Sequence, residues 1–280
     1  MRWGASKTVI EDEINSNLKN IIKAKKALIK ELPWFDANIW LGQPAFFPLA
    51  KELTADSLGR ILDKYSMRGA LVSHWDSVRF SAQEGNEALL KIDGSLPENV
   101  YTVWTGLPTT PEEQPPLPGT GKPHPRVRGI RVFPKTHQYQ LAPWVVGVLC
   151  EWCISYRLPL FIWHVEIEWD DVYNLAKTFP GLNIVIETQW QKIIYHLRDL
   201  FNLMKACRNI FVESSNLIGQ DNVSYFVKSL AADRILFGSF LPVNDPYTSM
   251  GMILDADISR SDMEKIAGLN LESLIHGVRL

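Results

Sequence analysis

The segment Leu158–Thr188 reads LPLFIWHVEIEWDDVYNLAKTFPGLNIVIET, and it decides the fold class. It opens with the apolar run LFIWH, continues through a helix-like stretch, and closes with a second apolar run, NIVIE. Apolar runs without polar alternation are typical of strands that are covered on both faces, as in parallel sheets. A strand, a helix and a second strand in this order form one β-α-β unit. The segment therefore predicts an α/β protein with a parallel sheet.

The same alternation extends from this segment in both directions. A doubly wound dinucleotide fold would need a glycine-rich turn after the first strand. The residues there read GQPAFFPLA, and their prolines oppose such a turn. We therefore expect a (β/α)8 TIM barrel over residues 33–280, with the proline-rich segment 107–124 irregular near its C-terminal mouth. The eight β-rich runs are 35–41, 69–74, 100–106, 127–134, 158–164, 183–188, 209–214 and 234–239.

Residues 1–32 precede this pattern and predict a helical extension outside the barrel. Apolar residues at helical spacing, from Ile14 to Leu28, mark one face, and lysines crowd the other. Pro33 ends the helix. The apolar face fits two roles, packing on the barrel or contact between two copies, so a homodimer is possible.

Composition narrows the partners and the compartment. The chain has 29 basic and 31 acidic residues, and no stretch is both basic and aromatic, so we expect no nucleic-acid partner. No apolar run is long enough to span a bilayer, and the N-terminus lacks the apolar core of a secretory signal. Three cysteines, an odd number, argue against a disulfide framework. We therefore expect a cytoplasmic protein without a membrane partner.

Several segments resemble the amidohydrolase superfamily, in the branch termed amidohydrolase-related or type 2. FDANIWLG at 35–42 lies where that family carries Asp-x-His-x-His, and GIRVFPKTHQYQL at 129–141 resembles its fourth-strand segment. FPGLNIVIE at 179–187, DRILFGSFLP at 233–242 and IAGLNLESLI at 266–275 resemble its sixth strand, eighth strand and closing helix. The resemblance spans about residues 35–280 and implies a metal-dependent-hydrolase-like barrel.

The same resemblance implies that most metal ligands are missing. Family members hold a divalent metal through histidines and an aspartate, and the metal activates a bound water. At the matching positions stand Asn38, Trp40, Thr188 or Glu187, and Phe240, so that only His164 is of ligand type. One imidazole does not hold zinc. We therefore expect no metal of the family kind and no other cofactor, although harder ions could still use carboxylates.

Polar side chains at the expected C-terminal strand ends are the candidate site residues. A histidine with a carboxylate partner is a general-base arrangement, and a lysine can polarise a carbonyl. Each has a structural alternative, such as an ion pair at the rim or simple solvent exposure. The indoles near strand ends, Trp40, Trp163 and Trp190 among them, fit either rim packing or an aromatic-walled pocket. The candidates are His164, Glu187 and Lys135 as catalytic residues, and Asn38, His74, His137, Glu213 and Asn244 as substrate-binding residues.

Three functions remain open at this stage. The first is a hydrolase or lyase that acts on a small organic substrate by metal-free acid–base chemistry. The second is a catalytically inactive, amidohydrolase-like barrel that binds a small molecule. The third is a metal enzyme with a site rebuilt from His164, Glu187 and Glu213. Fold alone does not choose among them.

Overall fold

The structure is a computed structural model that describes residues 4–108, 122–219 and 221–279. Its contacts divide the chain into two compact units, Met1–Leu32 and Pro33–Leu280. The first unit contains helix α1, Gly4–Glu31. Residues 109–121, most of the segment for which the sequence predicts irregular structure, lie outside the described residues.

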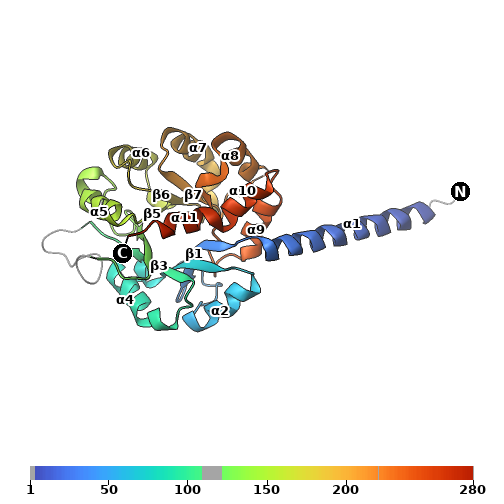
Figure 1. Ribbon diagram of the computed structural model, residues 1–280, viewed down its shortest axis with the longest axis horizontal. Coiled ribbons are helices and arrows are strands. Elements are labelled where there is room, and N and C mark those ends of the chain that lie inside the picture. The colour runs from blue at the N-terminus through green and yellow to red at the C-terminus, as the bar shows by residue number, and fades with distance from the viewer. Residues whose placement is uncertain (1–3, 109–121, 220, 280) are drawn as a thin grey trace. The chain divides into compact units, whose positions relative to one another are not determined.

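The second unit is a barrel of eight parallel strands in the order of the sequence, β1 to β8 (Figure 1). The segment that follows β8 closes the circle against β1. The Ala37 amide donates to the Phe237 carbonyl at 2.9 Å, and the Trp40 amide donates to Leu241 at 2.8 Å. The strands are β1 Phe35–Leu41, β2 Gly69–His74, β3 Val100–Thr105, β4 Val127–Val132, β5 Leu160–Trp163, β6 Ile184–Glu187, β7 Ile210–Glu213 and β8 Ile235–Leu236.

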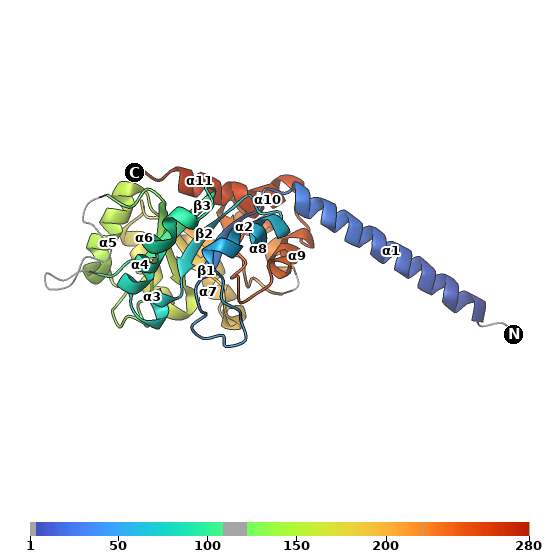
Figure 2. The same ribbon diagram turned by 90° about the horizontal axis from the view of Figure 1, so that it is seen from below.

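Helices alternate with the strands and surround them, as the two perpendicular views show (Figures 1 and 2). Among the described residues, no helix combines the length and the apolar character needed to cross a bilayer. The helices of this unit are α2 Ala55–Lys64, α3 Asp76–Arg79, α4 Ala82–Ile92, α5 Pro143–Tyr156, α6 Trp169–Thr178, α7 Leu197–Ala206, α8 Asn222–Leu230, α9 Pro246–Leu254, α10 Arg260–Glu264 and α11 Asn270–His276.

Packing explains why the apolar runs become strands. Every residue of β1, β5 and β6 is buried, because helices cover the barrel outside and side chains fill its inside. Phe35, Leu71 and Phe161 form part of the core near the N-terminal strand ends, and Leu271 and Ile275 of α11 pack against them. This end of the barrel is therefore closed by apolar side chains, which leaves the C-terminal end for a site.

The predicted TIM barrel is confirmed, and the strand boundaries differ mainly at their ends. The run expected at 158–164 forms a strand only over Leu160–Trp163. Pro159 has no amide hydrogen to donate to a neighbouring strand, and the Leu158 amide donates back to Cys153 at 2.8 Å. His164 begins a short 3-10 helix, His164–Glu166, and this helix turns the chain away from the strand direction.

Candidate functional site

A buried ion pair occupies the centre of the barrel. Arg131 of β4 donates from Nε to Oε2 of Glu187 on β6 at 2.9 Å, and its Nη2 donates to Oε1 of the same carboxylate. Its Nη1 donates to the Ser73 hydroxyl of β2, which in turn donates to the Val103 carbonyl of β3 at 2.7 Å. The guanidinium carbon lies 4.6 Å from the centre of the Trp40 ring on β1. One cation therefore links five strands.

A second carboxylate, Glu213 of β7, lies in the same polar interior. Its Oε2 accepts from the Asn38 side-chain amide at 3.3 Å, from the Thr188 amide at 3.3 Å and from the Ser215 hydroxyl at 2.9 Å. Burial raises its pKa to about 8, and the negative charge of Glu187 adds to that rise. The Glu213 carboxyl therefore holds a proton at neutral pH. Glu187, by contrast, has its charge paired with Arg131.

Asp36 ties β1 to the segment after β8. Its Oδ1 accepts from the Asn38 amide at 2.8 Å and from the Ser239 amide at 3.0 Å. Burial raises its pKa to about 6, and the hydrogen bonds from Ser239 and Asn38 oppose that rise. Asp36, the second residue of FDANIWLG, thus connects β1 to the segment after β8, where the barrel closes.

An aromatic layer covers the C-terminal strand ends. We call it the aromatic lid, and its buried members are Trp40, Trp75, Phe133, Trp163 and Phe240. The Trp40 ring centroid lies 4.6 Å from that of Trp75 and 5.3 Å from that of Trp163. The backbone of Phe240 has a φ of 59°, a left-handed conformation that is strained for a residue with a side chain. Rim packing, one of the two roles predicted for the indoles, therefore describes Trp40 and Trp163.

The three predicted catalytic side chains do not form one acid–base group. His164 is buried, and its Nδ1 lies 3.2 Å from the backbone carbonyl of Glu187. The Glu187 carboxylate faces Arg131 instead; burial raises its pKa, and the guanidinium opposes that rise. Lys135 is half exposed, pairs with Glu168 at 2.9 Å and donates to the Ile167 carbonyl at 3.0 Å. The contact between His164 and Glu187 is therefore made through the backbone carbonyl of Glu187 and not through its carboxylate.

The two predicted substrate-binding histidines, His74 and His137, contact residues of α3. His74 Nδ1 lies 3.3 Å from the Asp76 carboxylate, and the Asp76 amide donates to it at 3.2 Å. His137 Nε2 lies 2.9 Å from the backbone carbonyl oxygen of Ser77. Burial lowers the pKa of both imidazoles. Both imidazoles are therefore neutral at pH 7. Two further predicted substrate-binding residues, Asn38 and Glu213, belong to the polar interior described above.

A pocket of about 580 Å³ opens at the C-terminal mouth beside the aromatic lid. Of the predicted residues, Asn244 lines it. Phe47 and Trp190 form one wall, with ring centroids 5.2 Å apart, and the Phe47 ring meets the edge of Phe240 at 5.6 Å. The indole Nε1 of Trp190 is a buried donor without a partner among the described residues. The remaining lining residues are Ser215, Asn216, Ile218, Val243, Asp245 and Thr248.

Sequence reasoning missed most of these lining residues. Phe47 lies in the proline-containing loop after β1, and Asn216 is the last residue of the ESSN stretch, three positions after the end of β7. Their position directly after strands was the available signal, since loops at the C-terminal strand ends surround the mouth of a TIM barrel. Their ordinary residue types, however, do not distinguish a pocket wall from packing.

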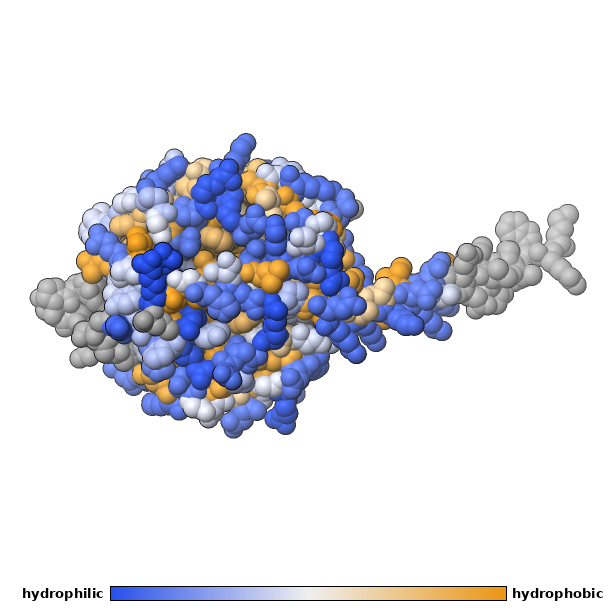
Figure 3. Space-filling model, viewed as in Figure 1, coloured by the Kyte–Doolittle hydropathy of each residue, from blue (hydrophilic) through white to orange (hydrophobic). Residues whose placement is uncertain are grey.

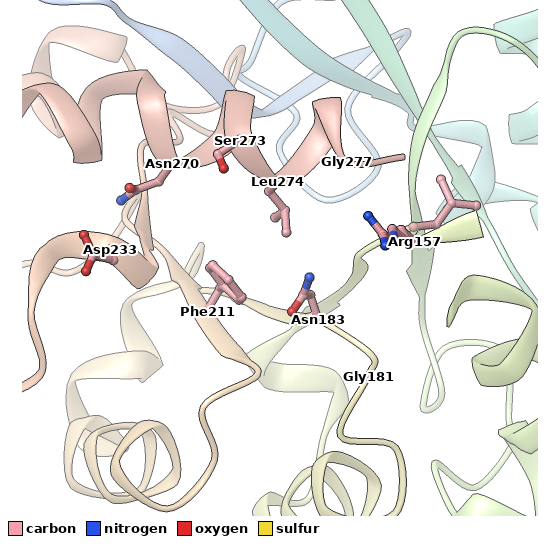
Figure 4. Close-up of a pocket in the computed structure, with 10 residues that line it drawn as sticks. Arg157, Gly181, Asn183, Phe211, Asp233, Asn270, Ser273, Leu274 and Gly277 are labelled. Atoms are coloured by element: carbon pink, nitrogen blue, oxygen red, sulfur yellow. The ribbon is translucent and has the colours of Figure 1, made fainter. Parts of the chain in front are cut away.

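A second pocket, of about 560 Å³, lies at the opposite end of the barrel (Figure 4). Leu274 of α11 points into it toward Phe211 of β7 and Asn183, which precedes β6 (Figure 4). Its acidic member, Asp233, pairs with Lys265 at 2.7 Å. This is the N-terminal face, where side chains of a TIM barrel serve stability, so the pocket at the mouth is the better candidate.

The residues at the expected metal positions do not fit a metal ion. Trp40 and Phe240 pack in the aromatic lid, and Glu187 is bound to Arg131 through both oxygens. Among the described residues, no group of three or more histidine, cysteine, aspartate or glutamate side chains could hold an ion. The set considered for a rebuilt site, His164, Glu187 and Glu213, is therefore not a ligand group here.

No protein-family model matches the chain, and no protein of curated function matches it by sequence. Solved structures do match. The 5-carboxyvanillate decarboxylase of Sphingomonas paucimobilis has a TM-score of 0.65 at 12% identity, over 88% of this chain and 99% of that one. Amidohydrolase 2 of Bifidobacterium longum subsp. infantis has a TM-score of 0.62 at 17% identity, over 88% and 99%. The fold is that of the amidohydrolase-type barrels.

A third similar structure carries a metal. The dihydroxybenzoic acid decarboxylase of Polaromonas sp. JS666, with bound manganese and an inhibitor, has a TM-score of 0.63 at 12% identity, over 88% of this chain and 97% of that one. These TM-scores show a common fold, as the resemblance in sequence predicted. Chemistry has to be argued from the side chains of this chain.

Proposed function

We propose that this amidohydrolase-type barrel binds a small, flat organic molecule in the pocket at its C-terminal mouth, without a metal ion of the family kind. One observation carries the proposal. Trp40 and Phe240, which stand where the resemblance expects a histidine and an aspartate, are buried in an aromatic lid. Their rings fill the space that a metal and its water would need.

The pocket has the features of a small-molecule site. Its volume of about 580 Å³ falls within the range of ligand pockets, and aromatic walls stand beside a few polar groups. Phe47 and Trp190 offer ring faces for stacking, which favours a flat ligand.

A metal-free hydrolase is the second candidate, and the contact between Ser215 and Glu213 favours it. Ser215 lines the pocket, and its hydroxyl donates to Glu213 at 2.9 Å. This contact places a nucleophile beside a carboxyl group that acts as a base once it has lost its proton. The Ser215 oxygen would attack the carbonyl carbon of an ester, and Glu213 would take the proton and pass it to the departing alcohol. Water would then release the acid from Ser215. The pKa of Glu213, about 8, requires that this rate rise with pH up to that value.

Binding is tested with three ligands that share one ring: benzoate, benzamide and benzylamine. We expect at least one of them to raise Tm of the wild type and to give a saturable calorimetric signal. Trp190→Ala should lose that signal, whereas Trp144→Ala should keep it, because Trp144 lies exposed on α5 and away from the pocket. Equal loss in both variants, or an unchanged signal in Trp190→Ala, would contradict the proposed site.

Metal content is measured on protein purified without added metal and again after incubation with zinc or manganese. We expect much less than one equivalent of retained ion and no change of Tm on chelation. About one tightly held equivalent, with an esterase or decarboxylase activity that chelation removes, would overturn the proposal. Ester hydrolysis that survives chelation and disappears in Ser215→Ala would favour the second candidate.

A further inference from the structure

Helix α1 carries a stripe of exposed apolar side chains. Ile14, Leu18, Ile21 and Ile22 are 53%, 50%, 51% and 52% exposed. Single exposed apolar residues are ordinary on a protein surface, but four large ones on one helical face mark an interaction surface. The described part of α1 shows hydrophobic (orange) surface among hydrophilic (blue) surface (Figure 3).

The spacing of the stripe is that of a coiled-coil seam. Positions 14, 18, 21, 25 and 28 of α1 advance by alternating steps of four and three, which gives the period of about 3.5 residues that keeps one seam facing a partner helix. All of these positions are apolar except Lys25. A single polar residue in a seam is a known means of fixing the register of a pair.

The distribution of charge along α1 favours a second copy of the helix as its partner, in antiparallel orientation. The sequence is acidic at 11–13, which reads EDE, and rich in lysine from 19 to 30. Two parallel copies would bring the lysine-rich halves together. Two antiparallel copies would bring each lysine-rich half beside the acidic segment of the other, which favours that arrangement by electrostatic complementarity.

We propose that α1 is a self-association helix through which two copies of this chain pair in antiparallel orientation. The seam supplies the buried apolar surface, and the segregated charges select the direction. The pairing does not depend on the proposed ligand site, because no residue of the mouth pocket takes part in it.

The first experiment measures mass in solution by light scattering on the full chain. We expect the wild type at tens of micromolar to have twice the 31.9 kDa mass of one chain. Leu18→Lys with Ile21→Lys should halve that mass, and Ser16→Lys with Asn20→Lys, which adds the same charge off the seam, should leave it unchanged. A monomeric wild type, or a seam variant that stays dimeric, would overturn the proposal.

The second experiment measures direction by the distance between spin labels on Lys30→Cys, since the native cysteines are all buried. An antiparallel pair centred on the seam, near residue 21, would separate the two labels by roughly 27 Å along the axis, at 1.5 Å per residue. A distance under about 20 Å would indicate a parallel pair and overturn the orientation. A monomeric wild type that binds vesicles of anionic lipid would instead assign the stripe to a membrane surface.

Discussion

The Arg131 guanidinium and the Glu187 carboxylate form a doubly hydrogen-bonded ion pair in the centre of the barrel, where their side chains are 1% and 0% exposed. This ion pair connects β4 and β6 inside the barrel. Both charges are satisfied within the protein, and the cation also contacts the Trp40 ring and the Ser73 hydroxyl. The first prediction follows from this pair.

Arg131→Met should lower the free energy of unfolding by about 3–5 kcal/mol, because Glu187 would keep a buried, uncompensated charge. Arg131→Met combined with Glu187→Met should recover much of that loss, since the pair of charges is then removed together. Chemical denaturation monitored by tryptophan fluorescence measures both. Arg68→Met, which breaks an ion pair of partly exposed side chains, should cost at most about 1 kcal/mol. A double variant as unstable as the single one would contradict this account.

The second prediction concerns pH and Glu213. Its pKa of about 8 in the folded state exceeds the ordinary glutamate value of 4.5, so the folded protein binds a proton that the unfolded chain has lost. The resulting stability is complete below about pH 4.5 and is lost as pH rises to about 8. Asp36, with a pKa raised to about 6, contributes in the same direction at lower pH.

We therefore expect Tm of the wild type to fall between pH 6 and pH 8 and then to level off. In this window Glu213 still titrates, whereas Asp36 has already lost its proton. Glu213→Gln should flatten this slope, because an amide does not titrate. Glu98→Gln, a change of the same kind at an exposed position, should leave the slope as it is. Calorimetry at half-unit steps of pH measures each profile, and an equal slope in the wild type and Glu213→Gln would refute the assignment.

The sequence predicted the barrel well because strands such as LFIWH and NIVIE are apolar on both faces, and only a covered parallel sheet buries such runs. It also predicted Glu187 and Glu213 at the C-terminal strand ends, as candidate site residues or members of ion pairs at the rim. It did not identify their partners, because Arg131 lies 56 positions from Glu187 and only the closed barrel brings them together. For the same reason the mouth pocket was invisible in sequence. Phe47 and Trp190 lie in two separate loops, and Thr248 lies in α9.

The third prediction concerns Gly238, in the segment that closes the barrel. A Cβ atom built there would lie 2.0 Å from Oε1 of Glu213, far inside contact distance, so this glycine makes room for the carboxyl group. Gly238→Ala should cost at least about 2 kcal/mol of unfolding free energy, as overpacking of an interior does. Gly251→Ala is the matched control. It lies in α9 with no atom within 4 Å of the added methyl, so it should be neutral or stabilising by up to about 1 kcal/mol.

The aromatic lid provides the last prediction, which asks whether one restored ligand brings back a metal site. Phe240→Asp places an aspartate where the resemblance expects one. Aspartate tolerates the left-handed backbone of position 240 better than phenylalanine does, so the backbone does not oppose the change. The environment does, because the lid offers rings rather than cations or hydrogen-bond donors around this buried side chain.

Phe240→Asp should therefore lose about 3–5 kcal/mol of unfolding free energy, the cost of deleting a core ring, and should bind no zinc. Phe80→Asp is the control, since Phe80 is exposed and its replacement removes no core contact. Denaturation curves measure the stability, and elemental analysis after incubation with zinc measures the metal. The carboxylate at 240 would have no second ligand beside it, because Trp40 cannot bind an ion and Glu187 remains held by Arg131. A stable Phe240→Asp protein with one equivalent of tightly bound zinc would show that the lid conceals a working metal site.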